Sequence, residues 1–422
     1  MPRLDSALAL VRRLVPRGTT PLVAASIGSQ LCTFAAIPFV SRWCGPQDFG
    51  LLQLYITLIT IAGLVASLRF DYALLQPELD AEARGLWTIG AGASFGIGCL
   101  AWLALPGLSY WQSTAGWEAL RDLGWAVGLA VALTGMSSGS SQWLIRKGNF
   151  NQLARARVIQ SIATASIQLS LAYLGAGGKG LILADVAGRT LGLVILVDRG
   201  LLCWSDVPRV RDIVRVAFAY QRFPKVSVPS AMINAVGFSL PVFFIERAFG
   251  THGVGVFSLL ERIMGIPTLF LGQPLSQTFT HRLREAMKHS KRRARGEVFS
   301  TSRTAAILGI FPFVALAVAG PWLVTLVFGP QWHDVGHLAQ LLAVPYFVAY
   351  AVWPVMPTLT VMNRLRTQMT WDTSRALALL AIGWLASRGH FSLGSIVGFV
   401  SIVMASFGVL HFYLCQRAAA NP

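Results

Sequence analysis

The sequence predicts an all-α integral membrane protein, and three observations lead to this fold class. Of its 422 residues, 54% are hydrophobic and 13% are charged, whereas a soluble domain carries about a quarter charged residues. Apolar runs of about 20 residues, the length that crosses a bilayer as a helix, recur along the whole chain. No segment shows the alternation of a membrane barrel strand. An ordinary soluble helical domain is therefore disfavoured.

The apolar runs divide into twelve predicted membrane spans. Before them, residues 1–19 carry four arginines among Leu and Val residues at helical spacing. This pattern predicts a cytoplasmic amphipathic segment on the membrane interface, and no cleavable signal peptide is expected. In chain order, the predicted spans are 20–41, 49–68, 86–105, 123–145, 153–174, 180–203, 226–245, 254–279, 304–328, 337–360, 368–387 and 392–415.

The distribution of Lys and Arg predicts the orientation of the chain. Assigning the loops alternately to two sides puts 28 of the 35 Lys and Arg residues on the side of the N-terminus and 5 on the other. Arg375 is counted with the cytoplasmic loops, and Arg189 and Arg262 remain inside spans. Because cytoplasmic loops are enriched in Lys and Arg, both termini are predicted to be cytoplasmic.

The longer cytoplasmic loop near the middle of the chain predicts the domain division. We expect two six-helix bundles, 20–203 and 226–415, joined by a cytoplasmic linker, 204–225. A short cytoplasmic tail, 416–422, follows the second bundle.

Residues 38–77 are predicted to form a helix, a turn and a second helix. Gly45 and Pro46 predict a tight turn, because Gly tolerates positive φ and Pro fixes its own φ. The spacing R-x2-G-x4-G at 42–50 recurs at 247–255, an offset of 205 residues. An offset close to half the chain predicts two structurally related halves.

Three predicted spans carry polar side chains along one helix face. These are Ser26, Ser29, Gln30 and Thr33 in the first span, Ser227, Ser230 and Asn234 in the seventh, and Gln160, Thr164 and Gln168 in the fifth. Such stripes point either to neighbouring helices or to a water-filled cavity. Both readings stay open. We expect cavity lining in the first and seventh spans, because both halves show the stripe.

Two predicted spans, the sixth and the eighth, each carry two charged residues well inside their ends, where a charge costs about 3 kcal/mol at a helix centre. Asp185 and Arg189 are four apart and can pair along one helix face, whereas Glu261 and Arg262 are adjacent. Both arginines lie roughly 12–14 Å from the outer ends of their spans. Two arginines at similar depth predict a phosphate or pyrophosphate site. Two internally neutralised structural ion pairs are an equal alternative.

Four further charged residues are candidates for gating. Arg69 and Asp71 lie at the cytoplasmic end of the second span and point to different faces if the helix continues. They either gate the cytoplasmic side or extend to the interface. Arg42 and Arg247 lie at equivalent outer turns and either lock the outer side or contact lipid headgroups.

Several motifs are excluded as sites of other chemistry. Gly175–Gly180 lacks the spacing of an ATP-binding loop, and Gly90–Gly98 predicts small-residue helix packing because no strand precedes it. His333 and His337 lack a third metal ligand, and the five scattered cysteines predict neither a disulfide framework nor a metal site. The basic run His281–Glu297 is expected to face anionic lipid, and a nucleic-acid role is disfavoured.

Five stretches carry a family resemblance. They are RWCGPQDFG with LRFDYALLQP (42–50 and 68–77), RAFGTHGVGVFSLLERIMGIP (247–267), LVFGPQW (326–332) and NRLR (363–366). With these stretches the chain resembles the Wzx-type polysaccharide flippases of the multidrug/oligosaccharidyl-lipid/polysaccharide exporter superfamily. The resemblance implies a MATE-like fold of two six-helix bundles around a cavity lined by helices 1 and 7.

The same resemblance implies transfer of an undecaprenyl-diphosphate-linked oligosaccharide from the inner to the outer leaflet of a bacterial inner membrane. The product would be lipopolysaccharide, capsule or exopolysaccharide. On this hypothesis Arg189 and Arg262 neutralise the diphosphate, while Asp185 and Glu261 orient them or take up protons. The sugars are expected to contact polar residues of the first and seventh spans, among them Ser26, Gln30, Ser230 and Asn234.

Two other functions are weighed against this hypothesis. A cation-coupled multidrug exporter of the same superfamily is the alternative, and a membrane glycan polymerase or ligase is less favoured because no large outer loop carries a catalytic set. We expect no enzyme activity and no cofactor; coupling to a proton gradient, a sodium gradient or the membrane potential stays open. Expected partners are membrane lipids and the polymerase and chain-length or export machinery of polysaccharide synthesis.

Overall fold

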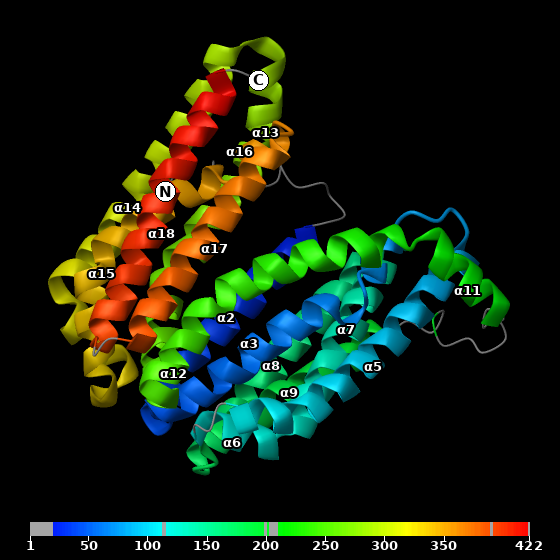
Figure 1. Ribbon diagram of the computed structural model, residues 1–422, viewed down its shortest axis with the longest axis horizontal. Coiled ribbons are helices and arrows are strands. Elements are labelled where there is room, and N and C mark those ends of the chain that lie inside the picture. Colours follow the sequence, from blue (N-terminus) through cyan, green and yellow to red (C-terminus); the bar gives the residue numbers. More distant parts are fainter. Residues whose placement is uncertain (1–19, 112–114, 198–200, 202–209, 389–390, 421–422) are drawn as a thin grey trace. The chain divides into compact units, whose positions relative to one another are not determined.

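The computed structural model describes residues 20–111, 115–197, 201, 210–388 and 391–420. These residues are almost entirely helical, and no strand occurs among them (Figure 1). The predicted interfacial segment 1–19, residues 204–209 of the predicted linker and the last two residues of the predicted tail lie outside the described residues.

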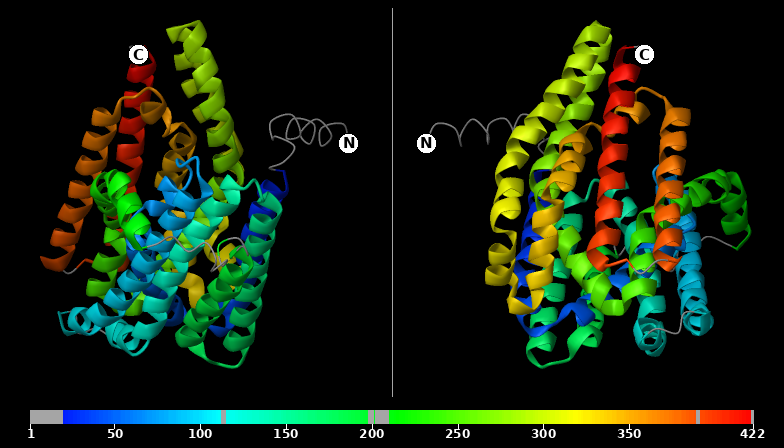
Figure 2. Two further views of the ribbon diagram at one scale, coloured as in Figure 1. Left: turned by 90° about the vertical axis from the view of Figure 1, so that its right-hand side faces the viewer. Right: turned by 60° about the vertical axis from the view of Figure 1, so that its left-hand side comes forward.

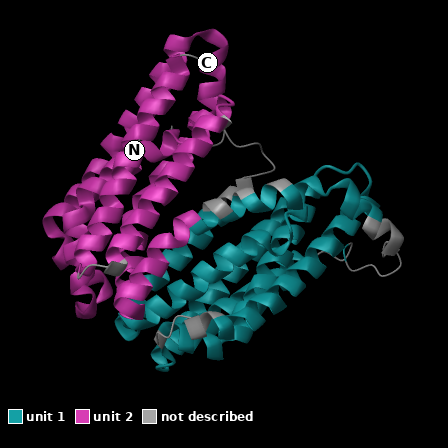
Figure 3. Cartoon of the chain, in the orientation of Figure 1, with its two compact units in different colours: residues 1–236 teal, residues 237–422 magenta. Residues whose placement is uncertain are grey.

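The chain divides into two compact units, Met1–Val236 and Gly237–Pro422 (Figure 3). The boundary falls inside a long helix, α12 (Val228–Pro267), and not in the predicted linker. Each unit has its own buried apolar core.

Six long helices make up most of unit 1. They are α2 (Thr20–Trp43), α3 (Pro46–Ala66), α5 (Asp80–Trp111), α7 (Gly124–Arg146), α8 (Phe150–Tyr173) and α9 (Gly177–Leu196). Shorter helices lie in the connections: α4 (Phe70–Ala73), α6 (Ala115–Asp122) and α11 (Val210–Ala219). Helix α5 packs along α7, and α8 packs along both α9 and α2.

Unit 2 contains most of α12 and the helices that follow it. These are α13 (Gln273–His289), α14 (Lys291–Phe328), α15 (His333–Val352), α16 (Thr358–Val361), α17 (Leu365–Arg388) and α18 (Leu393–Ala420). Helix α14 packs along α15, and both contact α18. Helix α12 covers most of the seventh predicted span and part of the eighth, and a break at Gly250, whose φ of 63° and ψ of −165° are not helical, separates the two.

A helix occupies each of the twelve predicted spans. Among the described residues, six helical segments are long and apolar enough to cross a membrane, and a seventh qualifies if α6 and α7, bent by 74°, count as one span. The chain is thus a multi-pass membrane protein. Twelve crossings and two cytoplasmic termini stay predictions.

Glycines let α5 and α7 approach each other closely. A Cβ added to Gly98 would lie 2.5 Å from the carbonyl oxygen of Gly128, and one added to Gly128 would lie 2.6 Å from that of Gly98. Such backbone contact is possible only where both residues lack a side chain. The small-residue packing predicted for Gly90–Gly98 is therefore confirmed at Gly98.

The turn before α3 differs from its prediction. Gly45 has φ −85° and ψ −180°, so the expected positive φ is wrong at this position, although Gly250 in the repeated motif has φ 63°. Gly45 instead precedes the helix in an extended conformation, and its N–H donates to Asp48 Oδ2 (3.0 Å). The hydrogen bond to the Asp48 side chain, and not a positive φ at Gly45, therefore shapes the turn.

Candidate functional site

The predicted pair on α9 forms the centre of a polar cluster in unit 1. Arg189 Nε donates to Asp185 Oδ2 (2.6 Å), as the i,i+4 spacing predicts. Tyr55 of α3 donates its hydroxyl to the same oxygen (3.0 Å), and an Arg189 Nη1 group donates to Thr134 Oγ1 of α7 (3.1 Å). Three helices therefore hold one guanidinium in a fixed orientation.

This cluster is only partly enclosed by protein. The side chains of Arg189 and Asp185 are 23% and 16% exposed, although both lie near the middle of α9. Charged groups at this depth almost always face the bundle interior or a water-filled cavity, because hydrocarbon does not solvate them. The guanidinium carries five N–H donors, so the contacts to Asp185 and Thr134 leave capacity for an anionic ligand.

The corresponding residues of unit 2 are arranged differently. Glu261 accepts a hydrogen bond from the Tyr346 hydroxyl of α15 and does not pair with the adjacent Arg262. Arg262 is half-buried in α12. Adjacent helical residues point about 100° apart, and the orientation of Arg262 by Glu261 stays a prediction.

Much of the polar stripe on α2 is used for contact with α8. Ser161 Oγ donates to the backbone oxygen of Ser29 (2.7 Å) and lies 3.2 Å from Thr33 Oγ1. Arg157 donates to Ser26 Oγ (2.9 Å). Contact with a neighbouring helix, one of the two readings of this stripe, thus holds for the side chains of Ser26 and Thr33, whereas the Ser29 hydroxyl donates to the backbone oxygen of Ser26.

Other stripe residues lie on α2, α12 and α8. Gln30 is half-buried on α2. Ser230 and Asn234 fall on α12, but their side chains lie outside the described residues. On α8, Gln160 and Thr164 pack against glycines of α9, so this stripe also serves helix packing.

The two predicted gating residues after α3 lie at a helix break. Helix α3 ends at Ala66, and both Leu68 (φ 50°) and Arg69 (φ 62°) are left-handed, which is strained for residues with a side chain. The helix therefore does not continue, and the prediction of two opposite helix faces does not apply. The Arg69 guanidinium lies 5.0 Å from the centre of the Tyr72 ring.

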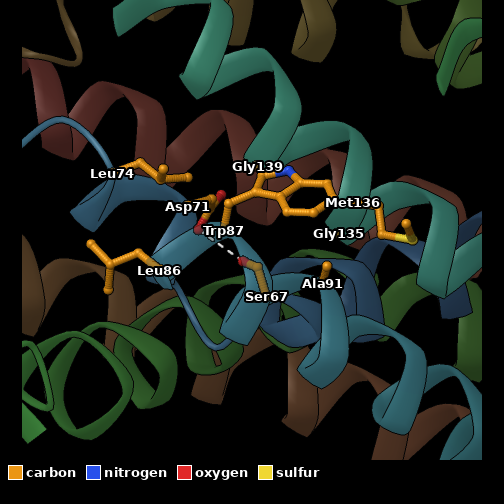
Figure 4. A pocket seen from close by; sticks show the side chains of 10 residues that line it. Ser67, Asp71, Leu74, Leu86, Trp87, Ala91, Gly135, Met136 and Gly139 are labelled. Carbon is orange, nitrogen blue, oxygen red and sulfur yellow. Dashed lines mark hydrogen bonds between the residues drawn. The ribbon is translucent and has the colours of Figure 1, made fainter. Parts of the chain in front are cut away.

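Asp71, in contrast, turns into the interior of unit 1. It is 4% exposed, and its carboxylate accepts hydrogen bonds from Ser67 (2.8 Å) and from Ser138 of α7 (2.5 Å). Figure 4 shows Asp71 and Ser67 beside Trp87 in a narrow pocket. The two hydroxyl donors compensate part of the cost of burying a carboxylate.

Arg42 and Arg247, the other two gating candidates, are exposed at turns. Arg42 is in the last turn of α2, and Arg247 lies three residues before the kink of α12. The structure does not distinguish the outer lock from the headgroup contact for either residue.

One charged residue was placed wrongly by sequence reasoning. Arg375, counted with a cytoplasmic loop, is the eleventh residue of α17 and is 4% exposed. Its guanidinium lies 4.1 Å from the ring centre of Phe238 and 4.7 Å from that of Trp371, with an Asp372 oxygen at 3.5 Å. Aromatic faces attract a desolvated guanidinium, which explains how α17 holds it.

A chain of polar contacts continues from this arginine to α18. Gln368 donates to Asp372 Oδ2 (3.1 Å), and its amide oxygen lies 3.2 Å from Nε2 of the fully buried His411. The signal was available in the sequence, because Gln368, Asp372 and Arg375 are spaced i, i+4 and i+7 and so share one helix face.

Asp48 is a second polar residue whose role was missed. Besides Gly45, it accepts a hydrogen bond from the N–H of Gly178 at the start of α9 (2.6 Å). One carboxylate therefore serves the N-termini of α3 and α9, where backbone N–H groups lack helical partners. The glycine-rich run 175–180 admits this contact, since a Cβ on Gly177 would lie 2.8 Å from Asp48.

The chain is similar to known proteins in sequence and in fold. The family model described as "Polysaccharide biosynthesis protein" matches residues 39–337. The chain is 22% identical over 418 residues to the succinoglycan biosynthesis transport protein ExoT of Rhizobium meliloti (strain 1021), covering 97% of this chain and 82% of that protein.

Solved transporters share the fold. An inward-facing multidrug resistance MATE family transporter of the MOP superfamily matches with a TM-score of 0.74 and 15% identity, covering 93% of this chain and 94% of that one. An outward-facing structure of such a transporter matches with a TM-score of 0.61 and 15% identity, over 95% and 94% of the two chains. The predicted all-α, MATE-like fold class is confirmed.

Proposed function

The chain belongs to the polysaccharide biosynthesis protein family, and on this premise we propose that it is a flippase for an undecaprenyl-diphosphate-linked oligosaccharide. It would move this substrate from the inner to the outer leaflet of a bacterial inner membrane by alternating access. The observation that carries the proposal is a partly exposed arginine in the middle of a helix of a MATE-like transporter fold. Lipopolysaccharide, capsule or exopolysaccharide would be the product.

Arg189 is the residue to which we assign the diphosphate. A guanidinium binds phosphate oxygens through paired N–H donors, and the polar cluster fixes its plane before the ligand arrives. Asp185 and Tyr55 would hold this orientation. In unit 2 we assign Arg262 a second contact with the head group, and polar residues of the first and seventh spans, including Gln30, would solvate the sugars.

The protein's own contribution would be binding and passage without covalent chemistry. We propose no enzyme activity, and a proton gradient, a sodium gradient or the membrane potential would drive transport. A polymerase and export machinery for the same polysaccharide would receive the translocated substrate.

The test is complementation of a flippase-null strain by Arg189→Ala, Arg189→Lys and Arg262→Ala. Surface polysaccharide, lipid-linked intermediates and membrane abundance are measured together. We expect the alanine variants to lose surface polysaccharide and to accumulate intermediates at normal abundance. Partial rescue by Arg189→Lys would mean that charge contributes more than the planar geometry of the guanidinium.

Lys179→Ala is the matched control, because Lys179 is an exposed cation at the start of the same helix. It should export normally. Normal export by both alanine variants would refute the assignment of the arginines. Wild-type protein that fails in several glycan backgrounds but confers drug resistance would favour the multidrug exporter.

A further inference from the structure

The most basic segment of the chain folds into a helical hairpin of unit 2. Helix α13 and the first turns of α14 form it, and Ser290 caps α14 by accepting a hydrogen bond from the N–H of Arg293 (3.2 Å). We call residues 273–303 the basic hairpin; its tip lies beside the end of α18 (Figure 2). We propose that this tip docks an acidic segment of a cytoplasmic protein partner. The proposal uses the predicted cytoplasmic orientation and not the proposed substrate.

The apolar side of the basic hairpin is already covered by its own unit. Phe279, Leu283 and Val298 are buried in one cluster with Leu359 and Cys415. Arg295 Nε also donates to the Gln416 side chain of α18 (3.1 Å). The hairpin is therefore held in place by packing, and most of its cations are not needed to attach it.

The cationic side chains of the basic hairpin are left exposed. They are Arg282, Arg284, Lys288, Lys291, Arg292, Arg293, Arg295 and Arg303. Within the hairpin, which lies wholly in the described part of the chain, one ion pair is found, Lys288 with Glu285 (2.7 Å). Such an excess of exposed cations fits an anionic partner.

The distance of the tip from the predicted membrane span favours a protein partner over the anionic lipid that the sequence predicted. The apolar part of α14 is predicted to begin at 304, so Lys291 stands about 20 Å beyond it at 1.5 Å per residue. A headgroup layer accounts for about 5–8 Å of this distance. The tip then lies farther from the headgroups than the Debye length of about 8 Å at physiological salt. Cations near Arg303 face the lipid, whereas those at the tip face cytoplasmic solution.

The test measures binding of fluorescent deca-glutamate to the full-length protein in nanodiscs of neutral phosphatidylcholine. The tip variant is Lys291→Gln/Arg292→Gln/Arg293→Gln. The base variant, Arg282→Gln/Arg284→Gln/Arg303→Gln, removes the same charge farther from the tip. We expect the tip variant to weaken binding about tenfold at low salt, as three exposed ion pairs would, and the base variant to weaken it less than about threefold.

Four outcomes would overturn the proposal, three of them with the acidic peptide alone. These are no salt-dependent binding by the wild type, equal losses in the two variants, or loss of wild-type binding when the nanodisc contains phosphatidylglycerol. The last result would assign the tip to lipid, and tighter binding of a single-stranded oligonucleotide than of the peptide would assign it to nucleic acid. Size exclusion and melting temperature verify folding, and Arg293→Gln alone replaces the tip variant if that variant is unstable.

Discussion

At the scale of single residues, buried polar groups decide the local structure around the α3–α4 break. Asp71 is supported by the hydroxyls of Ser67 and Ser138. We predict that Ser138→Ala destabilises the protein by about 1–3 kcal/mol, because it leaves one carboxylate oxygen with no replacement donor. Thermal unfolding in detergent measures this effect. Ser137→Ala on the same helix is the matched control, and equal melting temperatures for the two variants would contradict the prediction.

Side-chain contacts between different helices were the part of the structure that the sequence did not predict. The spacing of Asp185 and Arg189 predicted their ion pair, because i,i+4 neighbours lie on one helix face. The partners Tyr55 and Thr134 could not be predicted, since they come from helices far apart in the sequence. Arg375 was missed for a different reason. It was counted with a cytoplasmic loop, although its spacing from Gln368 and Asp372 places the three side chains on one helix face.

At the scale of helices, apolar runs predicted where helices occur, and glycines determine how closely they pack. We predict opposite effects for alanine at two glycines of α5. Gly98→Ala should destabilise by about 1–3 kcal/mol, because the added Cβ meets the backbone of Gly128. Gly96→Ala should be neutral or stabilising by up to about 1 kcal/mol, because nothing lies within 4 Å and alanine favours a helix.

The melting temperatures of these two variants, measured side by side, test the α5–α7 contact. Similar destabilisation by both would mean that the close approach at Gly98 does not limit packing. The crossing itself could not be predicted from the glycine run, because the run identifies a helix face without identifying the helix that it meets. The break inside α12 was predicted, because Gly250 suggested a turn between two helices and its φ of 63° and ψ of −165° are not helical.

At the scale of the whole molecule, composition and periodicity predicted the fold class. They do not distinguish a structural role of Arg189 from a role in binding the transported substrate. A charge swap, Asp185→Arg/Arg189→Asp, separates these roles. If the pair is structural, the swap restores part of the stability lost in Arg189→Ala, because opposite charges remain four residues apart. If Arg189 also binds the diphosphate, export stays absent in the swap, because the guanidinium has moved by about one helical turn, or about 5–6 Å.

We predict this second result: partial recovery of melting temperature without recovery of surface polysaccharide. A displacement of this size removes the paired N–H donors from the position of the phosphate oxygens, and a misplacement of about 1 Å can already cost on the order of 100-fold in rate. Complementation with matched membrane abundance, together with thermal unfolding of the purified variants, measures both quantities. Recovery of export in step with stability would mean that the pair acts only as a structural contact, and the diphosphate would then have to be assigned to other cations such as Arg262.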